Sequence, residues 1–361
     1  MASPPWNIAL PLPLALAIVL ACMAVAAFIV RAHDRRSRHH ARGEIAGFRH
    51  ALDRFLAEDS DAFELGRAAT EVTSGGFWTT LETCCVRLGY VRWLRLSRAL
   101  DAHPFPEAER RALRDESPWR RVLAARRLGL LRCERSRRSL RRAMVRGPEL
   151  VTLAAAAALA RYRDRAALRW VLRHPGSLAR RPHPALVGVL RSFGAPGLPD
   201  LHAALSSGMD SHRMERAVVE VLGLGRHRPA REALEERATS GDFDVRIAAL
   251  RSIGRLRAGE SAGLLLKALG DEAWQARAQA ARALGQIHAT AAVPALAARL
   301  TDPSWWVRRH AAYALRSLGR DGRAALRGVV ASSDDAYARD MANEALAGGF
   351  PPASARRERR G

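Results

Sequence analysis

A repeat with a period of 31 residues constrains the fold of this chain more than any other feature of its sequence. The clearest unit runs from Asp302 to Leu315, and its frame extends through eight units. The step from His183 to Glu215 is one residue longer than the others. The anchor residues of the eight units are Arg121, Thr152, His183, Glu215, Arg246, Arg277, Arg308 and Arg339. Such a period is typical of a repeat architecture rather than of separate domains.

Each unit carries the apolar stripe of an α-helix. The third and the seventh residue after every anchor are apolar, and this spacing places them on one helical face. The third residues are Ala124, Ala155, Leu186, Val218, Ala249, Ala280, Ala311 and Ala342. The seventh residues are Leu128, Leu159, Leu190, Leu222, Ile253, Leu284, Leu315 and Leu346. Another helix precedes each stripe, as Val293 to Leu300 illustrates, so each unit is a helical hairpin.

Stacking of the hairpins is compulsory, because one hairpin cannot bury both of its apolar faces. The sequence therefore predicts an all-α fold with an α-solenoid of about eight helical hairpins over residues 104–348. Amphipathic helices from Ile45 to Leu56 and from Phe77 to Leu88, separated by polar residues 74–76, are expected to cap the array within residues 43–103. Residues 349–361 are expected to form a disordered basic tail. The repeat is weaker over 145–215, where we expect a bend or an irregular unit.

The unit from Asp302 to Leu315, with its paired tryptophans, Arg308 and Ala311, resembles a HEAT repeat. The short period resembles the HEAT-like units of phycobilisome-lyase-type proteins, and the match is cleanest over 239–347. The resemblance implies a long surface that binds partners. Resemblance to bacterial membrane-anchored HEAT-repeat proteins further implies a partner in envelope or glycan assembly.

An uncharged apolar stretch over residues 8–30 predicts a single transmembrane helix, since its length of about 34 Å suffices to span a bilayer. Five arginines against Asp34 follow it in a basic linker over 31–42. By the positive-inside rule, we expect a single-pass protein of the bacterial inner (plasma) membrane, with its N-terminus outside and its solenoid in the cytoplasm.

A net charge of +23 indicates anionic partners, and +16 of it lies outside the linker and the tail. This favours nucleic acid as one alternative. The positive charge is weaker evidence for phosphate binding than it would otherwise be. All Lys and Arg residues but Lys267 are arginines, and such a bias is typical of a GC-rich bacterial genome. The four cysteines lack the spacing of a disulfide framework or a zinc site.

The sequence contains no phosphate-binding loop, no HExxH and no GxSxG. Gly223 and Gly225 lack the third glycine of a dinucleotide fingerprint, and His39 and His40 form the one adjacent histidine pair. We therefore predict that the chain is not an enzyme and has no catalytic residue, cofactor, metal or small-molecule substrate.

Acidic and basic residues six apart, as in Asp115–Arg121, Asp271–Arg277 and Asp302–Arg308, are expected to form a structural ladder between neighbouring repeats. Aromatic residues recur at the same turn, where they either shield repeat boundaries or form a recognition edge. Two adjacent indoles cannot easily be buried on one helical face, so one of Trp305 and Trp306 is expected to be exposed. The predicted partner-binding residues are Trp274, Trp305, Trp306, Arg308, Arg309, His310, Tyr313, Tyr337 and Arg339.

The sequence thus favours a membrane-tethered cytoplasmic scaffold or adaptor that binds a protein partner, itself membrane-associated. A nucleic-acid-binding solenoid and a protein similar to the phycobilisome lyases, which attach or remove bilins, are the alternatives.

Overall fold

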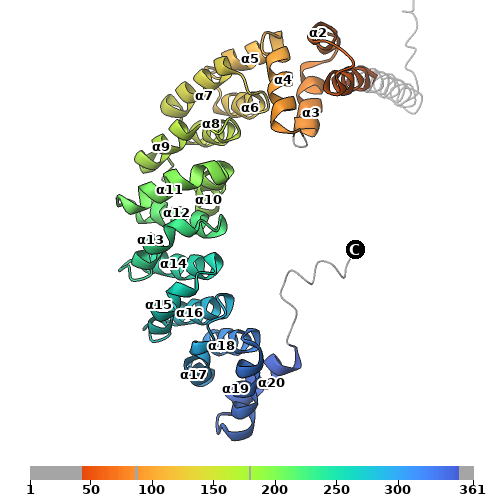
Figure 1. Cartoon of the computed structure of the whole chain (residues 1–361). Helices are drawn as coiled ribbons and strands as arrows, with labels where there is room; N and C mark the ends of the chain where they lie inside the picture. The colour runs from red at the N-terminus through yellow and green to blue at the C-terminus, as the bar shows by residue number, and fades with distance from the viewer. Residues whose placement is uncertain (1–42, 86–87, 179, 349–361) are drawn as a thin grey trace, which may run out of the picture. The chain divides into compact units, whose positions relative to one another are not determined.

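The computed structural model describes residues 43–85, 88–178 and 180–348 (Figure 1). It divides into two compact units, Met1–Arg138 and Ser139–Gly361, which we call the N-terminal unit and the solenoid unit. Within the described ranges the regular structure is entirely helical, which confirms the all-α prediction. The boundary between the units falls inside helix α7 (Glu134–Arg146).

The transmembrane part of the predicted fold is wrong. The stretch over 8–30 lies outside the described ranges, as do the linker over 31–42 and the tail over 349–361. Among the described residues, no helix is long and apolar enough to cross a membrane. The helices of the hairpins have 14 residues at most and alternate apolar with charged faces, whereas a span needs about 20 apolar residues. The predictions of a single-pass inner-membrane protein and of its orientation depended on this transmembrane helix, so they are wrong as well.

The N-terminal unit is built on an aromatic core. The ring of Phe77 stacks on Phe48 with centroids 5.3 Å apart and meets Phe105 edge-on at 5.1 Å. Residues 74–76, predicted as a break, instead form the first turn of a helix, because Gly76 lets that turn pack against Ile45 and Val72. The described helices of this unit are 43–57, α2 (Ala62–Thr70), α3 (Ser74–Cys85), α4 (Tyr90–Leu100), α5 (Pro104–Ala112) and α6 (Pro118–Leu128).

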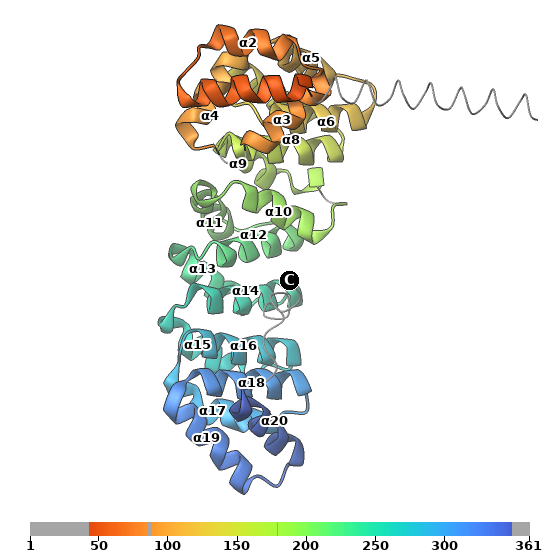
Figure 2. The ribbon, with the colours of Figure 1, turned by 90° about the vertical axis from the view of Figure 1, so that its right-hand side faces the viewer.

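Helical hairpins follow one another through the solenoid unit (Figures 1 and 2). The second helices of the hairpins are α8 (Glu149–Arg161), α10 (His183–Ser192), α12 (His212–Leu224), α14 (Phe243–Leu256), α16 (Trp274–Gln286), α18 (Trp305–Ser317) and α20 (Ala336–Ala347). The first helices that follow α7 are α9 (Arg165–Arg173), α11 (Leu198–Ser206), α13 (Arg231–Arg237), α15 (Ala262–Ala268), α17 (Val293–Ala298) and α19 (Gly319–Ser332).

The predicted period and apolar stripe are confirmed. The second helices from α12 to α20 begin 31 residues apart, each three residues before its anchor. Fifteen of the sixteen predicted stripe residues are buried, and Leu346, in the last helix, is half-buried. The helices α12, α14, α16 and α18 lie side by side in chain order, so the stripe of each packs against its neighbours (Figure 2). In the weaker segment, a 3-10 helix (Pro175–Leu178) precedes α10, which has only ten residues.

Neighbouring second helices approach closely at three glycines one period apart, Gly223, Gly254 and Gly285. A methyl group on Gly223 would lie 2.4 Å from the Cβ of Ser252 on the next helix. On the other two it would lie 2.9 Å and 2.8 Å from the Cα atoms of Ala283 and Ala314. Small residues thus face each other at these crossings, and a larger one would push the helices apart.

The expected ladder forms in the C-terminal half of the solenoid unit. Arg277 donates two hydrogen bonds to Asp302 of the next repeat, at 2.8 and 2.9 Å, and another to the Asp271 carbonyl of its own repeat. Arg246 pairs with Asp271 at 3.2 Å in the same sense. The ion pairs therefore bridge repeats, because each acid pairs with the arginine of the preceding unit. Within a unit, the arginine six residues after the acid donates to the backbone carbonyl of that acid. Asp115 instead accepts a hydrogen bond from the backbone of Ser117.

Candidate functional site

Exposed aromatic rings mark the start of the second helices. Phe243, Trp274 and Trp305 each occupy the first residue of their helix, and Tyr337 occupies the second. All four are exposed, Tyr337 to 70%. A first-turn side chain projects beyond the hairpin turn, so the 31-residue period repeats these rings along one edge of the unit. At the repeat boundaries these rings are therefore at least 39% exposed.

Trp305 and Trp306 are both exposed, at 43% and 50%, where we predicted exposure of one. Their rings meet edge-to-face with centroids 4.7 Å apart. Adjacent residues on a helix point about 100° apart, and neither indole belongs to the buried stripe of Val307 and Ala311. The result is a solvent-facing aromatic pair at the start of α18.

Arg309 joins this pair to the next helix. Its guanidinium carbon lies 5.1 Å from the Trp305 ring centroid and 5.0 Å from that of Tyr313. Arg309 also forms an ion pair with Glu344 of α20 at 3.3 Å, and the Tyr313 hydroxyl donates to the same carboxylate at 2.9 Å. Burial and this hydrogen bond to Glu344 raise the pKa of Tyr313. We call Trp305, Trp306, Arg309, Tyr313 and Glu344 the aromatic cluster.

Arg308 and Arg339 bond to backbone carbonyls at the start of their helices. Arg308 donates to the carbonyl of Asp302 at 2.8 Å, and its guanidinium lies 5.4 Å from the Tyr337 ring. Arg339 donates to the carbonyl of Ser333 at 2.7 Å. Trp274 lies one repeat before the aromatic cluster, on α16. Of the nine predicted residues, four thus come together in the cluster, while Arg308 and Tyr337 form a second contact beside it.

His310 is a half-buried residue of α18 near Arg282 of α16. Burial, followed by the positive charges of Arg282 and Arg309, lowers its pKa to about 4. The imidazole is therefore neutral at pH 7 and adds no third charge to those of Arg282 and Arg309.

Acidification is expected to destabilise the solenoid unit through His310. The unfolded chain binds a proton near pH 6.5 and the folded one near pH 4, so stability falls as the pH drops through this window. Between pH 7.5 and pH 5 the expected loss is about 2 kcal/mol. Urea denaturation at both pH values should show a smaller loss for His310→Gln, which cannot take up the proton. An equal loss in both proteins would contradict the assignment.

Glu344 was not among the predicted site residues. It stands 35 residues from Arg309, outside the six-residue spacing of the ladder, and a single acid in an otherwise regular helix gives no sequence signal.

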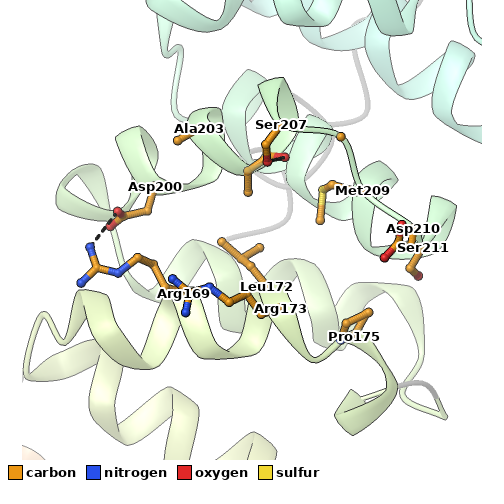
Figure 3. Close-up of a pocket in the computed structure, with 12 residues that line it drawn as sticks. Arg169, Leu172, Arg173, Pro175, Asp200, Ala203, Ser207, Met209, Asp210 and Ser211 are labelled. Carbon is orange, nitrogen blue, oxygen red and sulfur yellow. Dashed lines mark hydrogen bonds and ion pairs between the residues drawn. The ribbon is translucent and has the colours of Figure 1, made fainter.

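A pocket of about 550 Å³ opens between α9 and α11, and it too was missed (Figure 3). Leu172 and Met209 contribute apolar side chains, and Arg169 pairs with Asp200 at 3.5 Å. Asp200 also accepts two hydrogen bonds from Arg165, at 2.5 and 2.9 Å. The charges of this pocket are thus largely balanced, and it lies in the segment where the repeat pattern is weakest.

No group of acids, histidines and cysteines that could hold a metal ion occurs within the described ranges. The pair His39 and His40 lies outside those ranges.

Comparison with known proteins identifies the C-terminal repeats. A family model described as HEAT repeats matches residues 262–347, which contain all nine predicted site residues. No curated protein matches the chain.

Solved structures resemble the chain at low identity. An engineered protein is 16% identical and aligns over 83% of this chain and 98% of its own, with a TM-score of 0.42. The Escherichia coli protein YibA is also 16% identical, over 80% of this chain and 96% of its own, with a TM-score of 0.38. A mutant of Kap121p is 13% identical, over 85% of this chain and 43% of its own, with a TM-score of 0.48.

Proposed function

From the premise that this chain is a HEAT-repeat domain protein, we propose that it is a scaffold that binds another protein through the aromatic cluster on α18 and α20. The expectation of an envelope partner depended on the membrane anchor and is withdrawn with it. The proposed activity is binding rather than catalysis.

The exposed pair Trp305 and Trp306 is the observation that carries the proposal. Tryptophan, tyrosine and arginine are the residues that most often dominate the binding energy of protein interfaces. Here all three types lie together, with two indoles exposed by 43% and 50%. A partner that covers such rings removes apolar surface from water, and each Å² buried stabilises the complex by about 25 cal/mol.

The aromatic cluster is also preorganised for binding. Arg309 is held by Glu344 and lies beside Trp305, while Tyr313 donates to the same carboxylate. Side chains that are already ordered lose less conformational entropy when a partner covers them. The cluster therefore offers a fixed surface made of residues from two consecutive repeats.

A site-specific crosslink tests this proposal. A photo-crosslinkable phenylalanine analogue replaces Trp306 in the full-length protein in cells, and a matched control carries it at Trp119. Trp119 is likewise an exposed second residue of a second helix, α6, but lies in the N-terminal unit. We expect a nuclease-resistant protein adduct at 306 and none at 119, identified by mass spectrometry.

Removal of the indoles should abolish binding of the identified partner. Trp305→Ala/Trp306→Ala is expected to weaken its affinity by about 30-fold or more, because a hot-spot residue contributes at least about 2 kcal/mol. Trp119→Ala should leave the affinity within about twofold. Equal adducts at 306 and 119, or an adduct with nucleic acid alone, would overturn the scaffold function.

A further inference from the structure

Three arginines without carboxylate partners lie on the second helices beside the aromatic cluster. Arg251 and Arg255 stand one turn apart on α14, and Arg282 occupies on α16 the position of Arg251 one period later. Within the described ranges, none of the three forms an ion pair, whereas Arg216, Arg246, Arg277 and Arg309 of α12 to α18 do. Arg282 is exposed and the other two are half-buried.

Arg255 lies close to the positive charges of Arg251 and Arg282. Burial lowers the pKa of Arg255, and the charges of Arg251 and Arg282 lower it further, against the opposing charge of Glu220. The Nη1 atom of Arg255 is buried with no hydrogen-bond partner in the described part of the chain. A partly desolvated cation gains more from an added carboxylate than a fully hydrated one does.

The charge pattern limits the length of a ligand. The equivalent position in five consecutive second helices is occupied in turn by Glu220, Arg251, Arg282, Tyr313 and Glu344. The two central cations are thus bounded by an acid on one side and by the aromatic cluster on the other. Such a pattern suits a short acidic segment that continues onto an aromatic surface. A long polyanion such as a nucleic acid would meet carboxylates at both ends.

Residues 1–42 and 349–361 are basic and do not match such a segment. Residues 1–42 and 349–361 contain Asp34 and Glu358 as their only acids, among many arginines. Continuity with the aromatic cluster places the acidic segment on the protein partner.

We propose that Arg251, Arg255 and Arg282 bind an acidic segment of the partner protein in an extended conformation along the stacked second helices. The inference rests on the proposed scaffold function and adds the chemistry of the partner. Neighbouring helices lie about 8–10 Å apart, and three residues of an extended chain of the polyproline II type span about 9 Å and bring the side chain back to the same face. Carboxylates three residues apart therefore match Arg251 and Arg282, while the next side chains reach Tyr313 and the indoles.

Peptide binding to the full-length protein tests the inference. The probe is a fluorescent twelve-residue Gly-Ser peptide with glutamate at every third position, and the same peptide with glutamine is its control. We expect Arg251→Gln/Arg282→Gln to bind the glutamate peptide at least tenfold more weakly than the parent protein. The matched variant Arg323→Gln/Arg327→Gln removes two exposed arginines of α19, also without an ion pair in the described ranges, and should change affinity less than twofold.

Three results would overturn the inference: equal weakening by the two double variants, equal binding of the glutamine peptide, or tighter binding of a twelve-nucleotide oligothymidylate. The last result would assign the arginines to phosphate recognition. The failure of the scaffold function is distinguishable. A partner adduct at position 306 without peptide binding would contradict only the inference of an acidic segment. The absence of the adduct would contradict the scaffold function itself.

Discussion

Replacing Asp302 by alanine is expected to lower the free energy of unfolding of the solenoid unit by about 3–5 kcal/mol. The carboxylate is buried, its side chain only 1% exposed, and it accepts two hydrogen bonds from Arg277 and one from the backbone of Ser304. The alanine variant leaves the Arg277 guanidinium, itself 14% exposed, without its counter-ion. An uncompensated buried charge is the main cost.

Urea denaturation at pH 7 measures this effect, and Asp244→Ala is the control. Asp244 also pairs with an arginine of the preceding second helix, Arg216, but its side chain is 58% exposed. A surface pair of this kind contributes about 1 kcal/mol at most. If the two variants lost the same stability, the buried pair would not hold the repeats together.

The ion pair of Asp302 with Arg277 should also contribute to the loss of stability at low pH. Burial alone would raise the pKa of Asp302, but the hydrogen bonds from Arg277 and Ser304 outweigh it, so the pKa is lowered. A lowered pKa stabilises the fold above the unfolded value of 3.8, and this contribution disappears as the pH falls below it. The Asp302→Ala variant lacks this part of the acid transition.

Gly223→Ala is expected to destabilise the solenoid unit by about 3 kcal/mol, at the upper end of overpacking costs. The added methyl group would lie 2.4 Å from the Cβ and 2.7 Å from the Cα of Ser252, so backbone atoms of α14 would have to move. Ser252 also donates its hydroxyl hydrogen to the Val219 carbonyl at 2.9 Å, and a shift of α14 would disrupt that bond.

Gly188→Ala is the matched control, because Gly188 lies inside the second helix α10 with no atom within 4 Å of a new methyl group. Alanine is the better helix former, so this variant should gain up to about 1 kcal/mol. Thermal and urea denaturation of both variants should therefore give changes of opposite sign. A gain of stability in both would show that α12 and α14 are not in close contact at Gly223.

The sequence predicted those features that recur with the period. The stripe from Ala124 to Leu346 located the second helices, because burial of one face requires the same spacing in every unit. The ladder through Asp271 and Asp302 was predictable for the same reason. By contrast, the ion pair of Glu344 with Arg309, 35 residues apart, occurs only once. A contact that does not recur with the period cannot be recognised from the repeat pattern. The exposure of both indoles depended on how the first turn of α18 projects, which spacing alone does not fix.

The glycine crossings and the ladder both stop before the interface of α18 with α20, and this bears on cooperativity. At the interface of α18 with α20, Arg316 stands where the glycine of the period would be, and Ser333 where the next acid would be. Two of the couplings that join earlier repeats are thus replaced there by the contacts of Glu344 with Arg309 and Tyr313. In a stack with nearest-neighbour energetics, the terminal repeat opens independently when its coupling is weak. The last hairpin is therefore the element whose local unfolding a ligand on Trp305 and Arg309 would most directly suppress.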